Sequence, residues 1–130
     1  MIKQTELTGI HDEEVRLLRL LAHPTRLAVL QILRVDEECV CHMEAILGLR
    51  QAYLSQQLAV LREAGMVADR RDGWNIYYRL ADPRLIPLLD ALASATGADQ
   101  IKEHARGVGE RCPCPRCSET RERAAKAQAA

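Results

Sequence analysis

Aromatic residues are scarce in this chain: phenylalanine is absent, and the sequence holds one tryptophan and three tyrosines. The core of any fold built from it must therefore be aliphatic, with leucine as the main component. At 130 residues, with 48% hydrophobic and 28% charged residues, the chain suits one globular domain with a modest core.

Long apolar runs are also missing. No stretch approaches the roughly 20 residues that a membrane-spanning helix needs, and the opening MIKQTELTGI lacks the layout of a signal peptide. These absences predict a cytoplasmic protein with no membrane partner. The five cysteines are an odd number, which argues against a disulfide scaffold and for reduced thiols that are available to metal or redox chemistry.

Net charge is absent too, because eighteen basic and eighteen acidic residues cancel. The positive charge is nevertheless local: residues 50–79 carry five basic and three acidic residues, whereas residues 1–49 carry five and eight. A nucleic-acid surface is therefore expected within 50–79. A homodimer would double this excess and give a modest, salt-dependent grip on phosphates.

The stretch 50–64 has the pattern of an amphipathic helix. Leu54, Leu58 and Leu61 recur at helical spacing and form one narrow apolar stripe. The opposite side carries small or amide-bearing residues that allow a helix to sit deep in a major groove. These residues are Ala52, Ser55, Gln56 and Ala59.

A hairpin is predicted directly after this helix. Gly65 supplies a left-handed stop, and MVADRR and WNIYYRL alternate around Asp72-Gly73, which is a strong signal for a two-residue turn. Arg70 and Arg71 are expected at the tip. The pattern alone also fits an ordinary helix and hairpin whose arginines are solvated.

Three helices are predicted before this stretch, after a flexible arm at 1–11. Asp12 is expected to cap the first, which ends near Ala22, and Pro24 to begin the second, which runs to about Arg34. The third passes through Met43, Ile46 and Leu47 and is closed by Gly48. A helix, a short turn with glycine and a further helix make a helix-turn-helix, and the hairpin makes its wing.

A last long helix follows Asp82-Pro83, and its apolar residues cover more than one face. With the first helix it is the predicted dimer interface, although it could instead close the core of the monomer. The predicted fold is mainly α with a β-hairpin wing, a winged helix-turn-helix that is dimeric through the first and last long helices. Its domain spans 12–99, and a cysteine-containing tail spans 100–130.

Four runs together resemble the ArsR/SmtB family of metal-sensing repressors over about residues 13–95. They are LLAHPTRLAVLQIL, the CVC at 39–41, the helix followed by REAGMV, and the wing ending in YYRL. The resemblance implies a dimer that binds double-stranded operator DNA when metal-free and releases it on binding metal. The predicted DNA-binding residues are Arg50, Gln51, Ala52, Ser55, Gln56, Arg62, Arg70 and Arg71, with the arginines on phosphates or in the minor groove.

The thiol pair Cys39 and Cys41 is the candidate effector site. On a regular helix residues i and i+2 point about 200° apart, whereas in extended backbone they share a side. If they chelate, Cys39 must precede the third helix and Cys41 must lie in or just outside its first turn. The start of a helix also favours the thiolate that soft metals need. Metal capture would then pull on the helix that packs against the recognition helix.

The arsenic- and cadmium-type members of the family carry a longer motif with a third cysteine, where this sequence has Glu44, and an acidic residue where it has His42. The missing thiolates are expected from the tail, where Pro113 and Pro115 should keep the segment out of helix. The tail thiols are Cys112, Cys114 and Cys117. Three thiolates would suit As(III) or Pb(II), and four would suit Cd(II) or Zn(II).

Other functions stay open at this point. The tail could hold its own structural zinc with His104, or the thiols could sense oxidants or persulfides by forming a disulfide. The wing could also bind a protein as an adaptor. An enzyme is not expected, because thiol-disulfide oxidoreductases need a βαβ scaffold and no phosphate-binding glycine loop or Ser-His-Asp set is visible.

Overall fold

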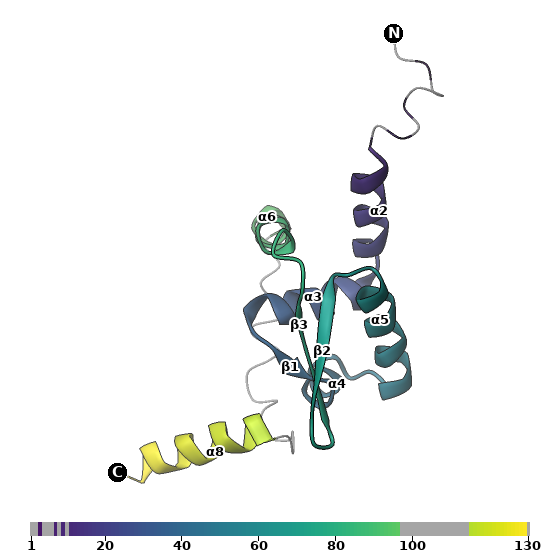
Figure 1. The fold of residues 1–130 in the computed structure, drawn as a ribbon. Helices are drawn as coiled ribbons and strands as arrows, with labels where there is room; N and C mark the ends of the chain where they lie inside the picture. The colour runs from purple at the N-terminus through teal and green to yellow at the C-terminus, as the bar shows by residue number, and fades with distance from the viewer. Residues whose placement is uncertain (1–2, 4–6, 8, 10, 97–114, 130) are drawn as a thin grey trace.

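The computed structural model describes residues 3, 7, 9, 11–96 and 115–129, and Figure 1 shows their fold. Most of the predicted arm at 1–11, and residues 97–114, lie outside the described residues. The described elements are α2 (Asp12–Leu21), α3 (Pro24–Val35), β1 (Glu38–Cys39), α4 (Val40–Leu47), α5 (Gln51–Glu63), β2 (Val67–Asp72), β3 (Asn75–Leu80), α6 (Leu85–Thr96) and α8 (Pro115–Gln128). Within this part of the chain, no helix is long and apolar enough to cross a membrane.

Local signals set the bounds of the helices that lead to α5. Pro24 is the first residue of α3, and the His23 side chain caps this helix by accepting a hydrogen bond from the N–H of Arg26 at 3.4 Å. Proline suits this position because its nitrogen has no hydrogen to leave unpaired. Gly48 ends α4 with a φ of 65°, a conformation that glycine adopts without steric cost. The predicted helix-turn-helix of α4 and α5 is confirmed.

The core is aliphatic, as the composition predicts. Leu54, Leu58 and Leu61 of α5 are fully buried. They belong to one cluster with Leu30 of α3 and Met43 of α4, and residues of β2, β3 and α6 join it. Because this stripe fixes the rotation of α5 about its own axis, the opposite side of the helix faces outward.

The hairpin is part of a three-stranded antiparallel sheet with the order β1-β3-β2. β2 pairs with β3 along its whole length, while β1 pairs Glu38 with Tyr78 and Cys39 with Tyr77. The sequence predicted only the hairpin, because a strand of two residues is too short to show alternation. The third strand ties the segment before α4 to the wing.

The turn of the hairpin lies one residue later than predicted. Asp72 pairs with Asn75, so the loop is Gly73-Trp74 and not Asp72-Gly73. Gly73 has a φ of 60° at the first loop position, where a type II′ turn requires a positive φ. Asp-Gly also fits a type I′ loop, and for that reason the dipeptide alone misplaced the turn. Arg70 and Arg71 therefore lie within β2 and not at the tip.

The helices α2 and α6 lie at the end of the molecule opposite the tip of the hairpin (Figure 1). Each buries part of its surface, through Leu21 in α2 and Leu85 and Leu89 in α6. Each also leaves large apolar side chains in solvent, since Leu18 is 58% exposed and Ile86 is 42% exposed. Within one protomer, α6 therefore does not use all of its apolar surface to close the core.

The start of α2 differs from the prediction. Asp12 is the first residue of the helix, and His11 before it is the N-cap without a side-chain hydrogen bond. The Asp12 carboxylate instead accepts a hydrogen bond from the N–H of Gly9 at 3.1 Å, on the preceding turn. An aspartate in the first turn still suits the positive end of the helix dipole. Its position therefore favours the helix without capping it.

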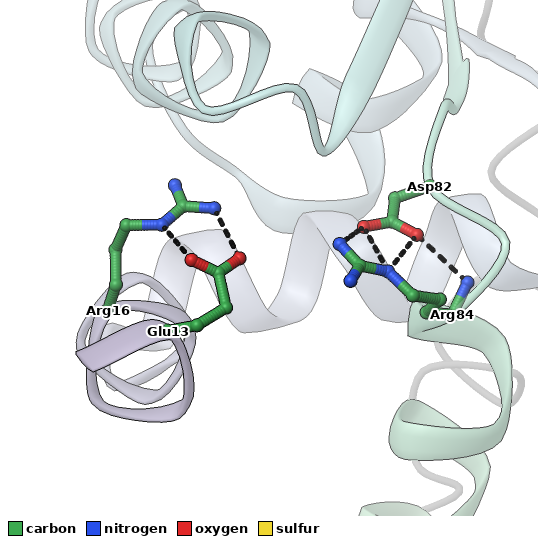
Figure 2. A network of polar contacts seen from close by, with 4 residues as sticks. All are labelled: Glu13, Arg16, Asp82 and Arg84. Carbon is green, nitrogen blue, oxygen red and sulfur yellow. Dashed lines mark hydrogen bonds and ion pairs between the residues drawn. The ribbon is translucent and has the colours of Figure 1, made fainter. Parts of the chain in front are cut away.

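Two ion pairs flank the space between α2 and the start of α6 (Figure 2). Arg16 binds Glu13 at 3.0 Å, and Arg84 binds Asp82 at 2.8 Å. These hydrogen bonds hold the pKa of each carboxyl group below its usual value. The same region holds an open pocket of about 190 Å³ that is lined by both acids, Arg84, Glu14, Leu17 and Leu85. An open hollow thus lies between α2 and the start of α6, with one local ion pair on each side.

We expect Leu58→Ala to lower the free energy of unfolding by about 3 kcal/mol, because it leaves a cavity in the centre of the core. The matched control is Val60→Ala on the same helix, where the side chain is 38% exposed and the expected loss is about 0.5 kcal/mol or less. Urea unfolding followed by circular dichroism measures both. Equal losses in the two variants would contradict the assigned face of α5.

Candidate DNA interface and thiol pair

The outward side of α5 is polar and exposed, as predicted. Gln51, Ala52, Ser55 and Gln56 are all exposed, and Gln51 is the first residue of the helix. Ala59, which was predicted on the same side, is only half-buried and lies nearer the core boundary. The helix begins at the end of the domain where the hairpin tip lies and runs away from it (Figure 1). The amide-bearing first turn and the wing therefore face the same end of the molecule.

The arginines of this surface differ in how firmly the protein holds them. Arg50 and Arg71 are exposed, and neither forms an ion pair within the described residues. Arg62 has a long contact of 3.4 Å with Asp69, which in solvent contributes little. Arg50, at the N-cap of α5, and Arg71 are thus the most available for a phosphate.

Arg70 of β2 is held in place by the carboxylate of Glu37, the residue directly before β1. Its Nη2 donates to Oε1 of Glu37 and its Nε donates to Oε2 at 3.0 Å, in the bidentate geometry that suits a guanidinium and a carboxylate. The hydrogen bond to Glu37 raises the pKa of Arg70 above its usual value. The guanidinium also lies over the ring of Tyr77, 4.5 Å from its centroid. Sequence reasoning missed Glu37 and Tyr77, because they lie 33 and 7 positions away from this arginine.

The thiol pair has the local geometry that chelation by both sulfurs would require. Cys39 is in the extended conformation of β1 and is the N-cap of α4, and Cys41 lies in the first turn of that helix. The two Sγ atoms are 2.8 Å apart, and no disulfide joins them. The Sγ of Cys39 accepts a hydrogen bond from the N–H of His42 at 3.3 Å. The two sulfurs therefore share one side of the chain, as a common ligand requires.

The thiols contact the wing. Cys39 is 1% exposed and Tyr77 is 2% exposed, and they form a small buried cluster against which the half-buried Cys41 packs. Tyr77 is also the backbone partner of Cys39 and the ring beneath Arg70. A continuous set of contacts thus joins the sulfurs to an arginine of β2.

His42 follows the thiol pair and has a carboxylate partner. Its Nδ1 lies 3.4 Å from Oε2 of Glu38, and its side chain is 13% exposed. His42 is thus packed and has a carboxylate partner within the protomer. Among the described residues, no group of three or more His, Cys, Asp or Glu side chains is arranged to hold a metal ion.

The tail differs in part from the prediction. Cys112 and Cys114 lie outside the described residues, whereas Cys117 falls in α8, which begins at Pro115. Pro115 was expected to keep the segment out of helix, and that was wrong for Cys117. Proline at the first helical position starts a helix without losing a hydrogen bond. How the three tail sulfurs lie relative to Cys39 and Cys41 stays a prediction.

Comparisons with known proteins agree with this architecture. Residues 23–69 match the family model described as bacterial regulatory protein, arsR family. The chain is 42% identical over 93 residues to the HTH-type transcriptional repressor SmtB of Mycobacterium tuberculosis, a match that covers 71% of this chain and 68% of that protein. The chain belongs to the arsR family. The family and its relatives are transcriptional regulators and not enzymes, as the sequence predicts.

Two further proteins similar to this arsR-family chain are also named as repressors. The chain is 50% identical over 76 residues to the biofilm growth-associated repressor of Agrobacterium fabrum, covering 58% of this chain and 65%, slightly under two thirds, of that protein. The crystal structure of the repressor BigR from Xylella fastidiosa is similar with a TM-score of 0.63 and 36% identity, covering 75% of this chain and 97% of that one. The winged helix-turn-helix fold is therefore shared along nearly the whole of that structure.

The two cysteines should differ in reactivity. We expect iodoacetamide to alkylate Cys41 at least about tenfold faster than Cys39 in the reduced native protein, because thiol reactivity follows access as well as ionisation. Mass spectrometry of the peptide that contains residues 38–50 measures the two rates. Unfolding in urea is the control and should equalise them, whereas equal rates in the native protein would contradict the burial of Cys39.

Proposed function

We propose that this arsR-family protein is a homodimeric repressor that binds operator DNA in its reduced, effector-free state and releases it when Cys39 and Cys41 capture a thiophilic effector. The observation that carries the proposal is the place of the thiol pair. The sulfurs stand side by side where β1 meets α4, and they contact Tyr77 of the wing. An event at the sulfurs is thereby mechanically connected to the surface proposed for DNA.

The DNA-binding surface combines α5 with the wing. Gln51, Ser55 and Gln56 can read base edges in a major groove, since amides and hydroxyls pair with the exposed edges of bases. Ala52 allows close approach of the helix. Arg50, Arg62, Arg70 and Arg71 would neutralise phosphates or enter the minor groove. All eight side chains are exposed, which supports this assignment.

The proposed dimer joins α2 and α6 of each protomer to those of the other. Val15 and Leu18 of α2 and Ile86 of α6 are large apolar side chains that stand exposed, at the end opposite the hairpin tip (Figure 1). Burial of such residues is the usual driving force for association. An interface there would leave both copies of α5 and the wing available, and a two-fold axis would match a palindromic operator.

As(III), Cd(II), Pb(II) and Zn(II) are the effectors that the donor set suits. Two thiols that converge from one side fit a soft ion as two of its ligands, and their contact of 2.8 Å supports a shared ligand. Three- or four-coordinate binding needs further thiolates, which Cys112, Cys114 or Cys117 of the same or the partner subunit would supply. The ion, once bound, would supply a rigid bridge between sulfurs.

Two routes connect the thiol pair to DNA. Spreading the sulfurs to ligand distance would disturb the pairing of Cys39 with Tyr77, and through it the ring under Arg70. It would also rotate the first turn of α4, and the helix α4 packs against α5. The first route was not visible in the sequence. Both act on the shape that fits DNA, so capture of the effector and operator binding would oppose each other.

A second candidate is a repressor of the same fold that senses oxidants or persulfides. The observation that favours it is again the separation of the two sulfurs, which is close enough for a disulfide to form with small movement. With hydrogen peroxide as oxidant, the thiols lose two protons and two electrons to form one S–S bond, and the peroxide is reduced to two waters. A chelator would reverse the response to a divalent ion, whereas a reductant alone would reverse this one.

Cys41→Ser tests the effector site. We expect the reduced variant to bind operator as the wild type does and to lose the response to As(III), which in the wild type should weaken binding by about 5- to 150-fold. Fluorescence anisotropy of a labelled operator, with and without As(III), measures both quantities.

Ala45→Ser, on the exposed side of the same helix, is the matched control and should keep the full response. Cys117→Ser asks whether the tail completes the site. A Cys41→Ser protein that still releases DNA in response to As(III), Cd(II), Pb(II), Zn(II) and peroxide would contradict the proposed site.

Arg71→Ala tests the wing. We expect weaker binding to all duplex sequences, and a plot of log K against log salt whose slope is shallower by about one for each protomer bound. Arg84→Ala, which removes an arginine paired with Asp82 at the opposite end, is the control and should leave the slope unchanged. An unchanged slope in Arg71→Ala would remove the wing from the phosphate contacts.

A further inference from the structure

The tip of the hairpin carries the single tryptophan of the chain. Trp74 is the second residue of the two-residue loop and is wholly exposed, at 102% of its reference area. Its loop partner Gly73 supplies the positive φ of 60° that the turn needs. The geometry of the turn therefore requires a residue such as Gly73 at the first loop position, but it does not require a tryptophan at the second.

An indole in this position contributes nothing to the fold of one protomer. The apolar residues of β2 and β3 that pack on the core are Val67, Ile76, Tyr78 and Leu80, and Trp74 is not among them. A tryptophan has one of the largest apolar surfaces of any side chain, and its burial is a main source of binding energy where it occurs at interfaces. The full surface of the Trp74 indole is thus available to a partner outside the protomer.

The surroundings of Trp74 favour DNA as that partner. Arg71 is exposed in β2 close to the loop, and the tip lies at the end of the molecule where α5 begins (Figure 1). Arg50, at the N-cap of α5, and Arg71 are both exposed and form no ion pair within the described residues. Positive charge at the end of the molecule that carries an exposed indole matches the negative potential and the apolar sugar walls of a narrow minor groove.

We propose that Trp74 is a DNA-contacting residue of the wing, an inference that rests on the proposed function. When α5 lies in a major groove, the hairpin crosses the adjoining backbone and its tip reaches the next minor groove. The indole enters that groove beside Arg71 and packs against the deoxyribose walls and base edges. Trp74 supplies apolar contact there, and Arg71 supplies the charge.

The lone tryptophan makes its own environment measurable. With excitation selective for indole, all of the fluorescence of the full-length protein comes from Trp74. We expect quenching by acrylamide to be efficient in the DNA-free protein and several-fold weaker when the protein is saturated with operator duplex. Saturation is established independently by anisotropy of a label on the DNA.

Substitution gives the second readout. Trp74→Ala should weaken operator binding by about tenfold, the order found for loss of an aromatic contact with bases, while the salt slope stays that of the wild type because no counterion release is lost. Trp74→Phe should retain most of the affinity. Val35→Ala removes another exposed apolar side chain, which is 63% exposed at the end of α3, and should bind as the wild type does.

Three results would overturn the inference. Unchanged acrylamide quenching in a saturated operator complex would do so while the proposed function stands. Protection that appears on dimerisation without DNA, and disappears on dilution, would make a second copy of the chain the partner instead. Absence of duplex binding by the unmodified protein would overturn the proposed function and this inference together.

Discussion

The pairing of the two-residue strand β1 with β3 is the contact on which the proposed regulation depends. It places Cys39 opposite Tyr77, and Cys39 is at the same time the cap of α4. One residue thereby belongs to the wing sheet and to the helix that supports α5. In a closely packed interior such a residue cannot move without moving both neighbours. A change at its sulfur therefore reaches the two elements proposed to contact DNA.

Much of the fold could be predicted from the sequence because its determinants are local. The stripe of Leu54, Leu58 and Leu61 fixes α5 by spacing alone, and Gly48 and Gly65 mark helix ends through a left-handed conformation that other residues avoid. The extended conformation of Cys39 could be predicted only on the hypothesis that Cys39 and Cys41 share a ligand, since sulfurs two positions apart converge only when the first residue is extended.

The remaining features depend on contacts between distant parts of the chain. The pairing of Glu38 with Tyr78 and the ion pair of Arg70 with Glu37 carry no local pattern. Trp74 was overlooked because Asp72-Gly73 is itself a good turn sequence, and only the register of β2 with β3 moves the loop by one residue. The sequence therefore predicted the parts of the candidate site, but the connection between thiols and wing required the structure.

Amide hydrogen exchange on the reduced, full-length protein, with and without As(III), tests most directly whether the thiols act through the wing sheet. If the account is right, As(III) increases exchange in peptides covering residues 37–41 and 75–80, where β1 pairs with β3, and leaves α2 and α6 unchanged. A protein that releases operator on As(III) while exchange at 75–80 stays constant would contradict it.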